Sequence, residues 1–250
     1  MEPKKKENVI LTGEFDFNEN KKIYFFKKMI FQCIGFGLFR AYKINPSWEA
    51  VQLIDECQFG SNIEIIKIQI PVAYNEVERI VEEIWTKYQP KLVIHCGVSC
   101  VARCLHLEKR AVTNKERYCQ PDIFSCLPKR CSNNDPLKPD YVYTDLNLET
   151  IRDEINQHYY EDNIEIPAKI SDCAGEFLCE YIYHCSLQYD CRRTLFIHVP
   201  DINRELSVKD LSKCIELVIH SALKQLDSLP PFIHQQKQPI NNSITNKIDE

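Results

Sequence analysis

The 250-residue sequence contains no apolar run of the roughly 18 residues that are needed to span a bilayer. Its first residues, MEPKKKENVILTG, also lack the long apolar segment of a secretory signal. Positive charge is not in excess, because the net charge is −5 and the basic residues are scattered among acidic ones. These absences argue against a membrane-spanning protein, a secreted protein and a protein that binds nucleic acid. We expect a cytoplasmic globular protein.

The sequence also lacks a CxxC pair, although it contains 13 cysteines. Thiols stay free in a reducing compartment, so each cysteine is a core residue, a metal ligand or a nucleophile. Four cysteines lie in apolar surroundings, and we interpret them as core filling: Cys57, Cys96, Cys185 and Cys214. Cys119, Cys126 and Cys131 together suggest a zinc site, but no fourth ligand is evident in their loop. We therefore do not expect a structural zinc in this loop.

Strand-like apolar runs alternate with helical apolar periodicity along most of the sequence. Strands are predicted at 7–12, 62–70, 91–98, 164–172 and 194–200, and helices at 46–57, 74–88, 146–160, 175–188 and 207–226. This alternation predicts an α/β protein, a three-layer α/β/α sandwich with a central, mostly parallel sheet. Residues 1–227 are expected to form a single domain, followed by a disordered tail at 228–250. The segment 112–145, rich in proline, asparagine and lysine, is expected to be a loop that covers a site.

Three residues occupy positions where such a fold places catalytic groups. His198 lies in TLFIHVP, where an apolar strand runs into a proline. Cys179 follows Gly175 and lies in the first turns of a predicted helix, where the macrodipole favours a thiolate. Glu108 lies near the end of GVSCVARCLHLEK, and a carboxylate that orients a histidine is the third group that cysteine catalysis commonly uses. Taken singly, a core histidine, a buried filler cysteine and a surface glutamate are the more frequent explanations.

Five segments of the sequence together resemble one family: GFGLFRAYKINPSW, IPVAYNEVERIVEEIW, GVSCVARCLHLEK, SDCAGEFLCEYIYHCSL and FIHVP. They resemble pyroglutamyl-peptidase I, a family of cytosolic cysteine peptidases that remove N-terminal pyroglutamate. The resemblance runs in order from about Val9 to Leu226. It implies a cysteine-type omega peptidase that acts through a thioester acyl-enzyme without a cofactor. In this family's pattern Cys179 is the nucleophile, His198 the general base and acid, and Glu108 the orienting acid.

The same resemblance implies a pocket for the pyroglutamyl ring of the peptide substrate. Phe36 and Phe39 match aromatic positions that pack against the ring, and Phe177 and Leu178 match the two positions before the nucleophile. Pyroglutamate is a small uncharged lactam, so apolar walls and a few backbone hydrogen bonds suit it. The competing interpretation is a catalytically impaired homologue that binds pyroglutamylated peptides or another partner.

The sequence departs from the family pattern at several positions. Arg40 stands where many members have a glycine, which puts the shape of the pocket in doubt. Ala102 stands where bacterial members carry an arginine, and animal members also lack that arginine, so the sequence belongs with the animal-type branch. The segment after Glu108 is glycine-free and slightly longer than usual, which indicates a remodelled substrate-covering loop.

The largest departure is the block from 14 to 35. In the family, Leu-Thr-Gly at the end of the first strand runs directly into Phe-Gly-x-Phe, and removal of these 22 residues restores that junction as LTGFGLF. Three explanations compete: an inserted loop, a rebuilt pocket, or intronic sequence retained in the coding sequence. The block is rich in Lys, Asn, Ile and Phe and has no hairpin turn or amphipathic period, which favours a retained intron.

Overall fold

A seven-stranded sheet forms the centre of the computed structural model, which describes residues 7–15, 32–33, 45–60, 63–128, 139–161, 166–202 and 206–227. The strand order is β3-β1-β2-β4-β9-β5-β8. The strands are β1 (Glu7–Phe15), β2 (Gln32–Cys33), β3 (Ile63–Pro71), β4 (Leu92–Ser99), β5 (Leu105–Glu108), β8 (Ala168–Ser171) and β9 (Thr194–Pro200). β1 pairs in parallel with β3 and β4, β4 with β9, and β5 with β8, whereas β5 and β9 are antiparallel. The expected mostly parallel sheet is confirmed.

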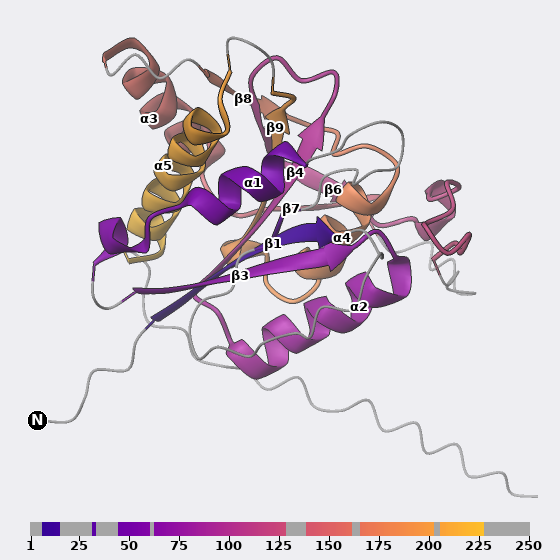
Figure 1. Cartoon of the computed structure of the whole chain (residues 1–250). Coiled ribbons are helices and arrows are strands. Elements are labelled where there is room, and N and C mark those ends of the chain that lie inside the picture. The colour runs from indigo at the N-terminus through magenta and orange to yellow at the C-terminus, as the bar shows by residue number, and fades with distance from the viewer. Residues whose placement is uncertain are drawn as a thin grey trace, which may run out of the picture.

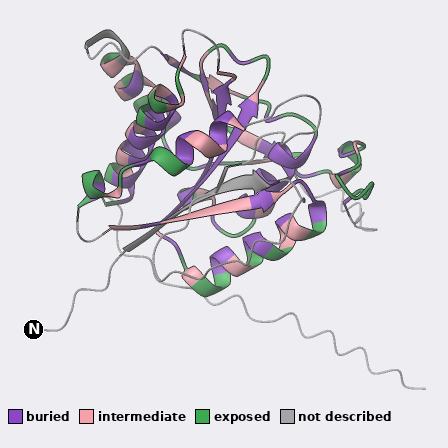
Figure 2. Ribbon diagram, viewed as in Figure 1, coloured by how far each residue is buried: buried purple, intermediate pink, exposed green. Residues whose placement is uncertain are grey.

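Helices cover both faces of this sheet (Figure 1). On one face lie α1 (Pro46–Leu53), α3 (Leu148–Glu161) and α5 (Val208–Asp227), and on the other lie α2 (Tyr74–Glu83) and α4 (Leu178–Leu187). Side chains alternate between the two faces along each strand. Leu195 and Ile197 of β9 pack in the first buried cluster, whereas Phe196 packs in the second, with α2 and α4. Figure 2 shows the sheet-facing sides of the helices as buried, so the α/β/α sandwich is confirmed.

Most elements lie where the sequence predicts them, with differences at their ends. Helix α1 starts at the N-cap Asn45, whose side chain accepts a hydrogen bond from the Ser47 N–H, and it ends at Leu53. The chain continues through a 3-10 turn, η1 (Glu56–Phe59), so the predicted helix over 46–57 is too long. Helix α2 continues as a π-helical turn, η2 (Ile84–Tyr88), and β8 is shorter than predicted.

Of the four cysteines that the sequence analysis interprets as core residues, one lies on the surface. Cys57 is exposed, because the helical period ends before η1 and the Asp55 carboxylate holds the Cys57 N–H at 3.0 Å in a solvent-facing turn. Cys96 and Cys214 are buried, and Cys185 packs against the cluster that contains α4. The interpretation is therefore wrong for Cys57 alone.

Four strands are absent from the sequence prediction: β2, β5, β6 (Arg110–Val112) and β7 (Tyr141–Tyr143). β6 and β7 form a small antiparallel sheet in which Val112 pairs with Tyr141. This pairing joins the two ends of the predicted 112–145 loop, which we call the excursion. Within the excursion, a 3-10 turn, η3 (Lys115–Arg117), follows β6. No helix in the described ranges is long and apolar enough to cross a membrane. The predicted tail at 228–250, the pocket residues Phe36 and Phe39, and all of the 14–35 block apart from four strand residues lie outside the described residues.

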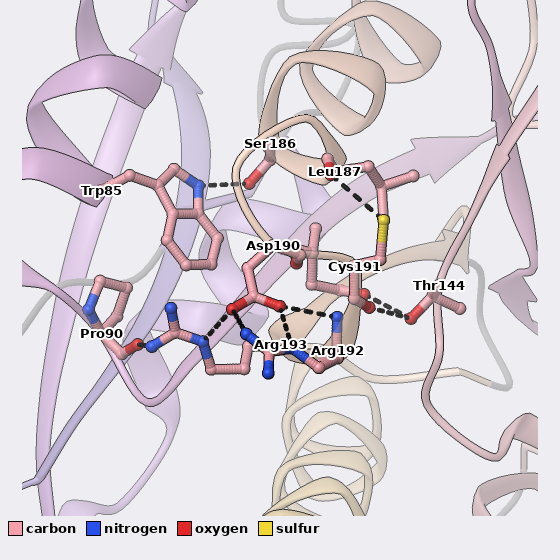
Figure 3. Close-up of polar contacts among 10 residues, drawn as sticks. Trp85, Pro90, Thr144, Ser186, Leu187, Asp190, Cys191, Arg192 and Arg193 are labelled. Atoms are coloured by element: carbon pink, nitrogen blue, oxygen red, sulfur yellow. Dashed lines mark hydrogen bonds and ion pairs between the residues drawn. The ribbon is translucent and has the colours of Figure 1, made fainter. Parts of the chain in front are cut away.

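A buried polar cluster joins the end of α4 to the start of β9 (Figure 3). It lies around the 3-10 turn η4 (Cys191–Arg193), where the Asp190 carboxylate accepts hydrogen bonds from both Arg192 and Arg193, the latter at 2.9 Å. The Arg193 guanidinium also donates to the Pro90 carbonyl, just before β4, and lies 5.1 Å from the ring centroid of Trp85. Asp190 thus holds together the ends of α4, β4 and β9.

Candidate active site

The two antiparallel strands β5 and β9 bring a carboxylate and an imidazole together. In their register His106 faces His198 and Glu108 faces Phe196, so Glu108 and His198 are diagonal neighbours on one face of the sheet. His198 Nδ1 lies 2.8 Å from Glu108 Oε1. Glu108 is fully buried and His198 is 5% exposed. An ionised carboxylate accepts from Nδ1–H, which leaves Nε2 of the imidazole for proton transfer.

Helix α4 supports this pair from the layer above the sheet. The Tyr183 hydroxyl donates a 2.8 Å hydrogen bond to the backbone carbonyl of Glu108. Glu108 is buried by residues far away in the sequence, because α4 covers its strand and β8 and β9 flank it. The surface-glutamate explanation, the more frequent one for a single carboxylate in a sequence, is wrong here.

Cys179 is the second residue of α4 and is 2% exposed. Gly175 precedes the helix with φ of 96°, a backbone conformation that glycine adopts without strain, and Phe177 is the N-cap residue. The positive end of the helix dipole therefore lies at the cysteine. Cys179 belongs to the same buried cluster as Phe196, which flanks His198 on the sheet face beneath α4. The structure thus brings the nucleophile candidate and the Glu108–His198 pair to one side of the sheet.

Aromatic side chains pack around the start of α4. Phe177 is buried and meets Tyr74 edge-on at 5.8 Å between ring centroids, and Tyr181 meets Tyr74 edge-on at 5.0 Å. The excursion is attached here as well, because the Tyr74 N–H donates to Asp122 and the Tyr74 hydroxyl to the Gln120 carbonyl. The described first part of the excursion therefore lies against α2 and the start of α4, on the side of the sheet that carries the site.

The predicted pocket residues are only partly described. Phe177 and Leu178 are 3% and 1% exposed, in the cluster that contains Cys179. Phe36 and Phe39 lie outside the described residues, so the pocket remains a prediction. Cys119 and Cys126 of the considered zinc site are exposed, and Cys131 is outside the described ranges. Among the residues described, no group of three or more His, Cys, Asp or Glu side chains could hold a metal ion.

Two further acidic or basic side chains near the site were missed by the sequence analysis. Glu180, next to Cys179 in the chain, is buried and accepts a hydrogen bond from the Val112 N–H of β6. Burial raises the pKa of Glu180 to about 7, although the Val112 hydrogen bond opposes this shift. His106 Nδ1 lies 4.0 Å from Glu108 Oε1, the oxygen that His198 also approaches. Alternation in LHLE would have placed His106 beside Glu108 had the sequence been assigned as a strand.

A buried carboxylate–imidazole pair and a cysteine at a helix N-terminus, on one face of an α/β/α sandwich, are the parts of a nucleophilic cysteine site. The site is thus of the class found in cysteine hydrolases. A family model described as pyroglutamyl peptidase matches residues 29–226. The chain belongs to the pyroglutamyl peptidase family and is a hydrolase of the cysteine peptidase type. The family resemblance inferred from the sequence motifs is confirmed.

Individual relatives extend this comparison. Pyroglutamyl-peptidase 1 from Homo sapiens is 28% identical over 193 residues, which cover 77% of this chain and 89% of that protein. Pyrrolidone-carboxylate peptidase from Brachyspira hyodysenteriae is 28% identical over 211 residues, covering 76% and 96%. Among solved structures, the pyrrolidone carboxyl peptidase from Thermococcus litoralis superposes with a TM-score of 0.65 at 23% identity over 78% of this chain and 93% of that chain. This last likeness supports the fold.

Proposed function

We propose that this chain removes N-terminal pyroglutamate from peptides, with Cys179 as nucleophile, His198 as general base and acid, and Glu108 as the orienting acid. The observation that carries the proposal is the 2.8 Å contact between His198 Nδ1 and the fully buried Glu108 carboxylate. This contact supports an orientation of the imidazole in which Nε2 serves as the proton-transfer atom. Family membership supports the choice of substrate.

In the proposed reaction, His198 takes the proton of the Cys179 thiol and the thiolate attacks the pyroglutamyl carbonyl carbon. Backbone N–H groups hold the resulting oxyanion, and the first turn of α4 supplies such groups because they have no acceptor within the helix. The C–N bond breaks as His198 gives its proton to the leaving amine. Water, deprotonated by His198, then attacks the thioester and releases free pyroglutamate, and the cysteine is restored.

We further propose that the pyroglutamyl ring lies between apolar side chains contributed by Phe36, Phe39, Phe177 and Leu178. A lactam ring without charge gains from apolar contact and needs only one donor and one acceptor. The burial of Phe177 and Leu178 beside Cys179 supports an apolar wall next to the nucleophile. The domain proposed to carry these groups is a single unit over 1–227, interrupted at 14–35.

The test is release of a fluorescent amine from a pyroglutamyl amide by the full 250-residue chain. We expect turnover that is lost in Cys179→Ala and that is absent with the matching prolyl amide, which lacks the ring carbonyl. Absence of turnover above the Cys179→Ala background would contradict the proposed activity of this form.

A second candidate function rests on the position of the 14–35 block. The family model begins at residue 29, inside the block, and leaves β1 unmatched. A chain with an intact catalytic trio and an altered pocket would bind pyroglutamylated peptides or another partner without turnover. Calorimetric binding of a pyroglutamyl peptide to a chain that shows no turnover would favour this alternative.

A further inference from the structure

A second histidine lies near the carboxylate of the Glu108–His198 pair. His106 lies directly opposite His198 in the β5–β9 register, on the same face of the sheet as Glu108. Its Nδ1 is 4.0 Å from Glu108 Oε1, whereas His198 Nδ1 is 2.8 Å from the same oxygen. One carboxylate oxygen therefore lies between two imidazoles, and it is hydrogen-bonded to only one of them.

The surroundings of His106 disfavour its charged form. Its side chain is 13% exposed, and its Nε2 is buried without a hydrogen-bond partner among the described residues. A proton on that nitrogen would create a buried donor with no acceptor, so the neutral ring carries its one proton on Nδ1, which at 4.0 Å is too far from Glu108 Oε1 for a hydrogen bond. Lys169 of β8 is the cross-strand neighbour of His106 in the β5–β8 register, and its positive charge also disfavours a charged His106.

Three charged or titratable groups act on His106 from the strands around it. Burial lowers the pKa of His106, the charges of Lys169 and His198 lower it further, and the Glu108 carboxylate opposes them. At neutral pH the imidazole of His106 is therefore neutral and does not attract the Glu108 carboxylate as a cation would.

We propose that His106 is a positioning residue of the proposed catalytic pair: while neutral, with its Nδ1 4.0 Å from Glu108 Oε1, it leaves that oxygen to His198, and once protonated its positive charge attracts the carboxylate away from His198. The inference rests on the proposed function, since it assigns a role within that site. The proton comes from solvent and no other bond changes. A protonated His106 also places a second positive charge beside the His198 imidazolium, which disfavours the thiolate–imidazolium pair. Activity is then lost on acidification through His106 as well as through the thiolate.

The activity test compares the pH profile of kcat/KM for wild type, His106→Gln and His220→Gln. Glutamine is polar and does not titrate. We expect the ratio of kcat/KM at about pH 5 to that at about pH 7.5 to rise roughly threefold to tenfold in His106→Gln, with a shallower acid limb. The readout is this ratio and not the absolute rate, because simple loss of packing at residue 106 would lower the rate at every pH alike.

His220→Gln is the matched control. His220 is also a half-buried histidine with a lowered pKa, caused first by burial and then by Lys224, but it stacks on Phe59 in the opposite layer of the sandwich. It should leave the pH profile unchanged. His106→Lys, which carries a lasting positive charge, should lower kcat/KM at about pH 7.5 by roughly tenfold or more. If His106→Gln and His220→Gln both retain the wild-type profile, the proposal is wrong.

A second measurement does not depend on turnover. The ring signals of His106 can be assigned by NMR from their loss in His106→Gln and then titrated in the full chain. We expect the midpoint to rise in His198→Asn, because a repelling charge is removed, and to fall in Glu108→Gln, because an attracting charge is removed. Unchanged midpoints in both variants overturn the proposal. Shifted midpoints in a chain without turnover support the coupling and contradict the proposed function instead.

Discussion

Replacement of Asp190 by asparagine tests whether the polar cluster between α4 and β9 holds these two elements in place. Its side chain is 7% exposed and accepts a hydrogen bond from Arg193, whose side chain is 11% exposed. Asparagine keeps the approximate shape and one acceptor oxygen but removes the charge. Arg193 would then remain a buried cation beside Trp85 and the Pro90 carbonyl without its anion.

The expected cost follows from this geometry. Removal of one partner of a buried ion pair costs about 3–5 kcal/mol. The Pro90 and Trp85 contacts persist, and asparagine retains an acceptor, so we expect a loss of about 2–3 kcal/mol in the free energy of unfolding. For a chain of this size that lowers Tm by about 4–12 °C. Arg192→Gln is the matched control. The Arg192 side chain binds the same carboxylate but is 54% exposed, so its replacement should cost less than about 1 kcal/mol in the free energy of unfolding.

Urea unfolding followed by tryptophan fluorescence measures these differences, since Trp85 lies in the cluster. The effect of Asp190→Asn should also depend on pH. Burial acts to raise the pKa of Asp190, but the Arg192 hydrogen bond and the Arg193 charge outweigh it, so the pKa is lowered on folding. A carboxylate of this kind stabilises the fold above its unfolded pKa, about 4, and loses that contribution as pH falls through its folded value. The reasoning is refuted if Asp190→Asn costs no more than Arg192→Gln, or if the difference stays constant from neutral pH to about pH 3.

Three further changes probe the site. Glu108→Gln keeps the side-chain shape but removes the charge that holds His198, so kcat/KM for a pyroglutamyl amide should fall by about 10²–10⁴-fold; near-wild-type activity in a folded variant would exclude the orienting role. The raised pKa of Glu180 means that ionisation of this buried carboxyl destabilises the wild-type fold as pH rises from about 4.5 to 7. Over this range Glu180→Gln should therefore gain up to about 3 kcal/mol in the free energy of unfolding relative to wild type. A pH-independent difference in urea unfolding would contradict this. Deletion of residues 14–35 should raise kcat/KM, and most mature transcripts should lack the 22 codons; their presence in most transcripts would overturn the retained-intron hypothesis.

The sequence predicts the elements that have a strong local pattern. β4 and β9 are continuous apolar runs, and α2 and α5 have clear apolar periodicity, so each lies within a few residues of its predicted bounds. β5 was missed because LHLE is short and half polar, and its burial comes from pairing with β8 and β9. Local sequence cannot show pairings of this kind, which form between residues far apart in the chain.

The site likewise combines residues that the sequence identifies with contacts that it does not predict. Family motifs select Glu108 and His198 as residue types, but the 2.8 Å contact depends on the antiparallel register of two strands about 90 residues apart. His106 is absent from the motif reasoning, because its closeness to the carboxylate follows from that same register. Cys57 was assigned to the core because its neighbours are apolar, and the break after α1 turns it toward solvent.

The central position of β9 has a consequence for synthesis of the chain. β9 pairs with β4 from Val93↔Thr194 onward, so about a hundred residues separate the two strands. Until residues 194–200 leave the ribosome, β4 has an open apolar edge, and such an edge is prone to pair with other nascent chains. The Glu108–His198 contact forms only when that edge closes. A nascent chain paused before β9 therefore contains the nucleophile candidate, Cys179, without the proposed base, His198. Such a chain is prone to aggregation and lacks part of the proposed catalytic site.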